Sequence, residues 1–412
     1  MPRWRHQLGA AARGVTRDTR SMHPSIVRQI HASRIFHVIR LNPLLSQREL
    51  VRQSGFDKST VSTIVQQFEA RGLVERERGS GSGRPGRPGE RIRLSERSGL
   101  LVGVNLRPHG LHLGAARLDG ALLADRVVPL PEAERLGATI QAETRAVVAE
   151  LGRGMEEVLA VGVALPGLLS RAGHLAQSPN LGWRDVPLRD ILARDVTRPT
   201  FLENNANAAA LAEYLFGSAV DFPDFVYLES GSGVGASIFL DGEVCRGASG
   251  FGGEIGHHKI VPGGRLCRCG ASGCLSAYVS VDSIRERLAR RGHPVQQGGD
   301  SDLAALEERA RMGDAPVLEV LAEAGHFLGA GLANVINIFN PPLVVLGGGL
   351  SRLYPWMRPA METAIARESL VAAREDCRID LAALSASSGC WGGVALALEG
   401  CTRFDAAETV PW

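Results

Sequence analysis

The chain has 412 residues, of which 44% are apolar and 22% charged, a composition typical of globular proteins with two or three domains. No stretch approaches the roughly 18 consecutive apolar residues of a membrane helix, and the arginine-rich N-terminus lacks the apolar segment of a secretory signal. These features predict no membrane contact and a cytoplasmic location. Residues 1–100 hold 19 of the 46 basic side chains but only 8 of the 44 acidic ones. This asymmetry favours a polyanionic partner for the N-terminal part alone.

Composition divides the chain into three parts. Residues 1–21 form a basic tail that we expect to be disordered, and Met22 is an alternative first residue to Met1. Residues 22–95 should form a mainly helical domain that includes a segment rich in Gly, Pro and Arg. Residues 96–412 should form a second, larger body, because short apolar runs there alternate with glycines and helical stretches.

Two short helices are predicted in the N-terminal domain. Ser46 and Glu49 have the spacing of a capping box, so a helix should begin there and end near Gly55. A second helix should run from about Lys58 to Gly72, because its apolar residues recur at i, i+3, i+4 and i+7. Two helices joined by three or four residues form a helix-turn-helix.

A wing is predicted after the second helix. The segments 73–75 and 92–94 can pair as a β-hairpin whose tip would carry two arginines. In a winged helix, the N-terminal residues of the second helix contact base edges and phosphates, and hydroxyl side chains suit both surfaces. The alternative is a three-helix interaction module with a flexible tether. We predict binding to double-stranded DNA through Gln47, Lys58, Ser59, Thr60, Ser62, Thr63, Arg84 and Arg87.

The larger body has the alternation of strands and helices that is typical of an α/β fold. We interpret as strands the apolar runs 100–106, 158–165, 225–228, 236–240 and 343–346, and as helices the stretches 206–216 and 317–339. Two segments, 100–118 and 225–240, share a strand–turn–strand pattern. This similarity suggests a duplicated α/β architecture.

Three of the seven cysteines lie within eight residues, at Cys267, Cys269 and Cys274, shortly after two adjacent histidines. An odd number of cysteines without an export signal disfavours a disulfide framework and favours metal binding by this cluster. One imidazole and three thiolates form a closed tetrahedral set, which is typical of structural zinc. Spacing alone does not choose between His257 and His258 as the fourth ligand. The alternative is three unrelated thiols near an incidental histidine pair.

The metal motif also carries a resemblance to a protein family. The run GEIGH, followed by CRCGASGCL, is similar to the signature of the ROK family (repressors, open reading frames and sugar kinases). The resemblance covers about residues 22–400, and its other segments are VALPG at 163–167, SPNLGW at 178–183, ENNAN at 203–207, GSGVG at 231–235 and LGGG at 346–349. It implies an actin-like or RNase H-like fold of two α/β lobes with a sugar cleft between them. It also implies His257, not His258, as the zinc ligand.

Kinases of this family carry groups that this chain lacks. Their first phosphate loop has the pattern DxGGT, whereas residues 105–109 here read NLRPH. The bulky side chains and the missing N–H of Pro108 prevent a close approach of the backbone to phosphate. The resemblance places the catalytic aspartate at Asn205, whose amide cannot accept a proton. We therefore predict that the protein is not an enzyme, with a sugar kinase that carries an added DNA-binding domain as the alternative.

A sugar pocket is implied by the same resemblance, with contacts at Asn180, Asn204, Asn205, Glu254 and His257. A carboxylate and several amides provide both the acceptors and the donors that sugar hydroxyls require. Ser276 departs from the family, which often has a sugar-binding glutamate at this position. This departure leaves three alternatives: weaker binding, a sugar other than glucose, or no sugar ligand.

Together these features predict a bacterial transcriptional regulator, a repressor of sugar-metabolism genes. A homodimer or homotetramer would bind a palindromic operator, and a sugar or sugar derivative would change the placement of its DNA-binding domains. Such an effector must bind the two states with different affinity. A structural zinc ion would hold the loop that carries Glu254 and His257. A docking protein that needs no ligand is a further alternative.

Overall fold

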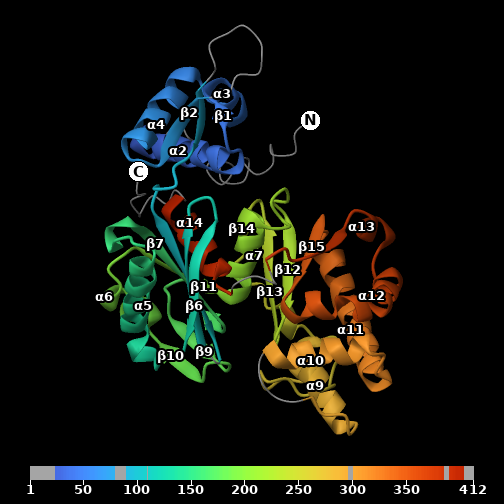
Figure 1. The fold of residues 1–412 in the computed structure, drawn as a ribbon. Helices are drawn as coiled ribbons and strands as arrows, with labels where there is room; N and C mark the ends of the chain where they lie inside the picture. The colour runs from blue at the N-terminus through green and yellow to red at the C-terminus, as the bar shows by residue number, and fades with distance from the viewer. Residues whose placement is uncertain (1–23, 79–89, 109, 296–299, 385–388, 403–412) are drawn as a thin grey trace.

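The computed structural model describes residues 24–78, 90–108, 110–295, 300–384 and 389–402. These residues form a small N-terminal domain and two α/β lobes that lie side by side beneath it (Figure 1). The predicted fold class, a winged helix-turn-helix followed by a two-lobed α/β body, is confirmed. No helix in these ranges is long and apolar enough to cross a lipid bilayer. The predicted basic tail lies outside the described residues.

The N-terminal domain contains the predicted helix-turn-helix and the two strands of the wing. Ser46 caps the first of the paired helices in a reciprocal bond with Glu49, and Gly55 ends that helix with a φ of 76°, as expected for a left-handed C-cap. Val74 pairs with Leu94 in the antiparallel hairpin. The elements are α2 (Pro24–Leu41), β1 (Leu45–Ser46), α3 (Gln47–Ser54), α4 (Lys58–Ala70), β2 (Val74–Arg78) and β3 (Glu90–Leu94).

The first lobe is built on a five-stranded sheet of order β11-β7-β4-β5-β6. Its strands are β4 (Leu100–Arg107), β5 (Gly110–Arg117), β6 (Leu122–Val128), β7 (Val158–Leu165) and β11 (Thr200–Asn204). The helices α5 (Leu136–Glu150) and α6 (Leu188–Asp195) contribute apolar side chains to a core on one face of this sheet. A small antiparallel sheet at the edge contains β8 (Leu168–Leu169), β9 (Leu175–Ser178) and β10 (Trp183–Val186).

The second lobe repeats this topology, with the sheet order β14-β13-β12-β15-β16. In both sheets the strands follow the order third, second, first, fourth, fifth, which supports the duplication suggested by the sequence. The strands are β12 (Phe225–Ser230), β13 (Val234–Leu240), β14 (Glu243–Val244), β15 (Leu343–Gly347) and β16 (Arg378–Leu381). The helices are α8 (Ser276–Val279), α9 (Val281–Arg290), α10 (Asp300–Arg311), α11 (Ala315–Phe339), α12 (Gly348–Glu368) and α13 (Val371–Glu375).

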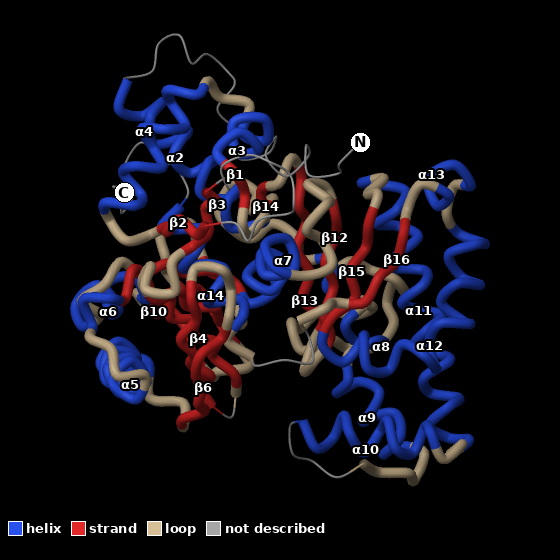
Figure 2. The backbone as a smooth tube through the Cα atoms, turned by 45° about the horizontal axis from the view of Figure 1, so that its top comes forward, coloured by secondary structure: helices blue, strands red, loops and turns tan. Residues whose placement is uncertain are grey.

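Two further helices, α7 (Asn205–Phe216) and α14 (Trp391–Thr402), lie between the two sheets (Figures 1 and 2). The helix α14 packs closely on β4 and β7 of the first lobe because glycines face each other there. A Cβ added at Gly162 would collide with the carbonyl oxygen of Gly393, so only glycine permits this approach. The two helices therefore fill the space between the lobes, below the N-terminal domain.

A candidate metal centre, an inter-lobe pocket and a DNA-binding surface

Four side chains converge at the edge of the second lobe, as the cysteine spacing predicts. The ligand atoms of His257, Cys267, Cys269 and Cys274 all lie within 4.8 Å of one another. Cys267 Sγ is 3.7 Å from His257 Nδ1, and Cys269 Sγ is 3.7 Å from Cys274 Sγ. A zinc ion with Zn–S bonds of about 2.3 Å would separate its sulfur ligands by about 3.8 Å, so this donor set fits tetrahedral zinc.

The loop conformation determines which of the two histidines faces the cysteines. A short 3₁₀ turn at Ile255–His257 directs the ring of His257 towards the thiols. The ring of His258 lies elsewhere, with Nδ1 2.6 Å from the carbonyl oxygen of Ile255. Gly270 and Gly273 have φ angles of 89° and 79°, and this left-handed backbone brings the cysteines together.

His257 joins the thiol cluster to a carboxylate. Its Nε2 atom lies 3.9 Å from Glu254 Oε2, on the side of the ring opposite to the nitrogen that faces Cys267. Burial, and then the charge of Lys259, lowers the pKa of His257, which favours the neutral imidazole that a metal requires. Burial raises the pKa of Glu254. A potential metal ligand and a potential sugar contact are therefore neighbours on one loop.

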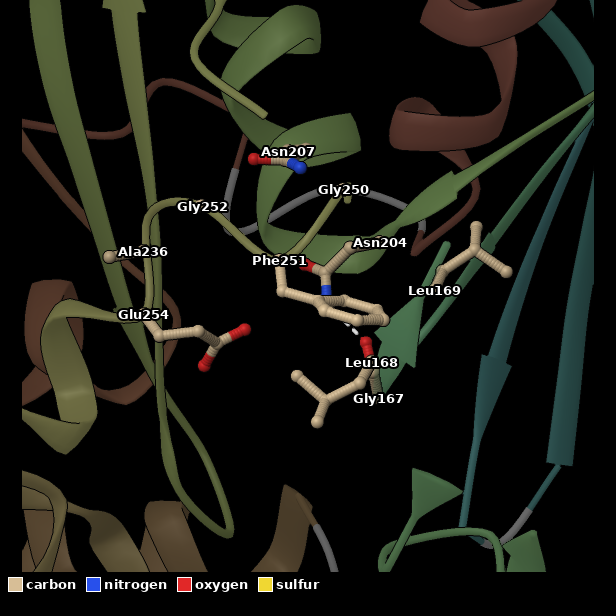
Figure 3. A pocket seen from close by; sticks show the side chains of 10 residues that line it. All are labelled: Gly167, Leu168, Leu169, Asn204, Asn207, Ala236, Gly250, Phe251, Gly252 and Glu254. Carbon is tan, nitrogen blue, oxygen red and sulfur yellow. Dashed lines mark hydrogen bonds between the residues drawn. The ribbon is translucent and has the colours of Figure 1, made fainter. Parts of the chain in front are cut away.

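A small pocket lies beside Glu254, between the two lobes (Figure 3). Its lining residues are Gly167, Leu168, Leu169, Asn204, Asn207, Ala236, Gly250, Phe251, Gly252 and Glu254. The carboxylate of Glu254 points into it, whereas the amide of Asn204 is engaged by the backbone. Asn204 Nδ2 donates to the carbonyl oxygen of Gly167 at 2.9 Å, and its Oδ1 accepts from the N–H of Ala206 at 2.8 Å. Asn204 thus caps α7 and shapes the pocket.

Three of the sequence-predicted sugar residues, Asn180, Asn205 and His257, are not among the residues that line this pocket. Asn205 instead donates from Nδ2 to Glu229 Oε1 at 3.1 Å. Tyr227 donates to the other oxygen of Glu229, also at 3.1 Å, and burial raises the pKa of this carboxyl group. Asn205, where the family resemblance implies the catalytic aspartate of the kinases, therefore forms a hydrogen bond with a partly buried glutamate.

Ser276, where the family resemblance implies a glutamate in many members, is also not among the residues that line the pocket. Its Oγ accepts a hydrogen bond from the backbone N–H of Val234 at 3.0 Å, and the side chain is buried. The residue therefore joins the start of α8 to β13 and does not offer a hydroxyl to a ligand. Asn105 lies where the family resemblance implies the first phosphate loop of the kinases, and its Nδ2 donates to the carbonyl oxygen of Gly389 at 2.8 Å.

The N-terminal ends of α3 and α4 carry six of the residues that we predicted to contact DNA. Lys58, Ser59 and Thr63 are exposed, and Gln47, Thr60 and Ser62 are partly exposed. The hydroxyls of Ser59 and Thr60 donate to the carboxylate of Asp57, the N-cap of this helix. These hydrogen bonds, first from Ser59 and then from Thr60, hold the pKa of Asp57 far below its usual range. The predicted wing-tip residues Arg84 and Arg87 lie outside the described part of the chain.

Several residues of these sites were not found from the sequence. Lys259 donates to Cys274 Sγ at 2.9 Å, and a lysine there offsets the negative charge of three thiolates. It is one of only two lysines in the chain, and this rarity beside the cysteines could have indicated its role from the sequence. Phe251, which is exposed and lines the pocket, and the partly buried Glu229 have no such signal, because their roles depend on segments far apart in the sequence.

Comparison with known families and proteins gives matches over both parts of the chain. Residues 102–400 match the family model described as "ROK family", and residues 28–85 match that described as "MarR family". The xylose repressor of Caldicellulosiruptor bescii is 26% identical over 395 residues, which cover 92% of this chain and 98% of that protein. The DNA-binding transcriptional dual regulator NagC of Escherichia coli K12 is 28% identical, over 85% of this chain and 87% of its own.

Solved structures agree with this assignment. A ROK family transcriptional regulator, a homolog of the E. coli MLC protein, aligns with a TM-score of 0.78 and 26% identity over 92% of this chain and 97% of its own. A ROK family glucokinase from Streptomyces griseus, in complex with glucose and AMPPNP, aligns with a TM-score of 0.61 and 27% identity over 73% of this chain and all of its own. The family match spans well over half of the residues, so the chain belongs to the ROK family.

Proposed function

We propose that the protein is a DNA-binding repressor of bacterial sugar-metabolism genes that acts in the cytoplasm and responds to a sugar or sugar derivative. One combination of features carries this function. The helix α4 has exposed side chains at its N-terminal end, and the kinase-like body has an amide, Asn205, where a kinase needs its catalytic base. Asn205 cannot accept a proton, and Glu229 already engages it. The relatives that match along both parts of the chain bear the names of repressors and transcriptional regulators.

Two predicted sugar residues are suitable for contacting the effector. The carboxylate of Glu254 points into the inter-lobe pocket, where it can accept hydrogen bonds from sugar hydroxyls. Asn204 forms the opposite wall. A zinc ion held by His257 and the three cysteines would fix the loop that carries Glu254, and Lys259 would offset the charge of the thiolates. A homodimer or homotetramer would place two recognition helices on a palindromic operator.

The DNA assignment is tested by sequencing the fragments that the protein binds in cells, followed by affinity measurements on a recovered site. The double variant Lys58→Ala/Arg87→Ala should weaken binding about tenfold or more and reduce the dependence on salt, because two cationic contacts are lost. Arg145→Ala, on an exposed part of α5 in the body, is the control and should bind like the unmodified protein. Equal affinities for both variants would contradict the assignment.

The choice between repressor and kinase is tested by incubating the protein with ATP, magnesium and a hexose panel. We expect no sugar phosphate above background, and any ATP-dependent product would overturn the non-enzymatic assignment.

Thermal unfolding with D-xylose and N-acetyl-D-glucosamine tests the effector. A higher melting temperature with one of these, or with another sugar of the panel, supports the proposal, whereas no shift with any sugar favours the ligand-independent alternative.

A further inference from the structure

The helix α2 of the N-terminal domain lies across the ends of α14 and α7. Ser33 Oγ donates to the carbonyl oxygen of Thr402, and His37 Nε2 lies 3.0 Å from Thr402 Oγ1 at the end of α14. Arg40 Nη1 donates to the carbonyl oxygen of Leu215 at 3.1 Å, in the last turn of α7. We call this set of contacts the seam.

Charge and packing favour this placement of Arg40. Its guanidinium group lies at the C-terminal end of α7, where free carbonyls and the helix dipole attract a cation. The group also lies over the ring of Phe216, 5.1 Å from the ring centroid. Arg40 Nε donates to His37 Nδ1 at 3.4 Å, so Nε2 of a neutral His37 carries the hydrogen that faces Thr402. The polar contacts of the seam are therefore mutually consistent.

The two helices that α2 contacts are attached to different lobes. The helix α14 packs on β4 and β7 of the first sheet. The C-terminal part of α7 is tied to the second lobe, because the buried carboxylate of Glu213 accepts hydrogen bonds from the backbone N–H groups of Ala383 and Leu384, just after β16. The same end of α7 also packs on α14, where the ring of Phe216 lies 5.6 Å from that of Trp391, so a change in the relative position of the lobes would act on the helices that α2 crosses.

The other end of α7 lies at the pocket. Its N-cap, Asn204, lines the pocket, and its first residue, Asn205, is bonded to Glu229 on β12 of the second sheet. The twelve residues of α7 span about 18 Å as one helix. Buried apolar side chains of α2, α14, α7 and the second sheet also form one continuous cluster, which includes Ile35, Leu211 and Phe225. Packed helices transmit small displacements because the interior is dense.

We propose that α7 couples the inter-lobe pocket to the DNA-binding domain, and that a displacement of this helix reaches α2 through its contact with Arg40. This inference rests on the proposed function, since it assumes an effector in the pocket and DNA on α4. An effector that changes the lobe arrangement displaces α7 relative to α14. Arg40 and His37 then move α2, and with it the helix-turn-helix. Without these contacts the pocket and the DNA-binding surface become independent sites.

The first test measures operator affinity with and without the sugar that raises the melting temperature. In Arg40→Met, which keeps the apolar stem but removes the donor and the charge, the sugar should bind within twofold of its normal affinity. The sugar should then change DNA affinity less than twofold. Arg145→Met is the control and should keep the full response. A full response in Arg40→Met would overturn the coupling, whereas a wild-type protein that binds no sugar or no DNA would instead contradict the proposed function.

The second test needs neither ligand. Asn205→Ala removes the bond between α7 and the second sheet, and it should change the amide hydrogen exchange of residues 33–41 in α2 at least threefold. In the Arg40→Met background the same substitution should cause no further change, because the contact that transmits it is missing. Unchanged exchange of α2 in Asn205→Ala would contradict the proposal. The milder Thr402→Val removes only a hydroxyl from the seam, and it should likewise reduce the change in α2 exchange that Asn205→Ala causes. This variant provides the same test if Arg40→Met does not fold.

Discussion

At the residue scale, the surroundings of Asn205 favour an amide over the aspartate that the family resemblance implies for kinases at this position. Asn205 donates to the partly buried carboxylate of Glu229, 3.1 Å away, and Tyr227 donates to the other oxygen of the same group. An aspartate at 205 would place two carboxylates in contact in a desolvated site, and both could not be ionised at low cost. The amide at position 205 and the carboxylate of Glu229 are therefore chemically matched.

Asn205→Asp should destabilise the protein by about 1–3 kcal/mol at pH 8, because a donor is replaced by a repelling charge. The carboxyl pair will have its pKa raised in the folded state, so the protonated form is favoured there. Stability should therefore be largest at low pH and fall as the pH rises through the raised pKa. Urea unfolding at pH 5.5 and pH 8 measures this dependence, and Asn205→Asp/Glu229→Gln should abolish it. Equal stability of Asn205→Asp and wild type at pH 8 would contradict the proposed pairing.

The thiol cluster gives a second prediction at the residue scale. Cys269→Ser should reduce the metal content from about one zinc ion per chain to a small fraction, because a structural site needs its four ligands. The melting temperature and any sugar response should fall with it, since Glu254 shares the loop. Cys245→Ser is a matched control, because Cys245 is exposed and lies outside the cluster. Zinc content is measured by mass spectrometry, and equal zinc in both variants would contradict the assignment.

The elements follow from local sequence patterns wherever one face is buried. The strand interpreted at 158–165 has these bounds in the structure, and the helix interpreted at 206–216 begins one residue earlier, at Asn205. The capping box at Ser46 also needed only local chemistry. The strands of the wing extend beyond the predicted segments 73–75 and 92–94, to Arg78 in β2 and to Glu90 in β3. They bury little apolar surface, so their sequence carries a weak period-2 pattern.

Ser46→Ala should weaken α3 by about 1 kcal/mol, because the cap hydrogen bond to the N–H of Glu49 is lost. Amide exchange within α3 should then become about fivefold faster, as expected for a local opening that costs 1 kcal/mol less. Ser62→Ala, at an interior position of α4, is the control and should leave the exchange of α3 unchanged. The absence of a difference between the variants would show that tertiary packing alone holds α3.

At the scale of the whole molecule, a histidine, His37, lies where the N-terminal domain contacts the body. Burial, and then the charge of Arg40, lowers the pKa of His37 to about 3. The unfolded chain binds this proton near pH 6.5. Between these values the unfolded state holds more protons than the folded one, so stability rises with pH in this window and is constant above it.

Lowering the pH from 7.5 to 5 should therefore destabilise wild type more than His37→Gln, which has no titrating ring. Urea unfolding at the two pH values measures the difference. His293→Gln, on an exposed turn, is the control and should lose as much stability as wild type. A His37→Gln variant with the full pH dependence would show that the seam does not contribute to it.

The sequence by itself determined the helix-turn-helix, the α/β strand pattern and the thiol cluster, because each depends on residues within a few turns or one loop. The tertiary structure decided which groups lie in the pocket and which lie elsewhere. Asn205 faces Glu229, Ser276 faces the backbone of Val234, and Arg40 reaches Leu215 across 175 residues. These contacts join segments whose proximity is created only by the packing of the two lobes and the N-terminal domain. No local pattern in the sequence encodes them.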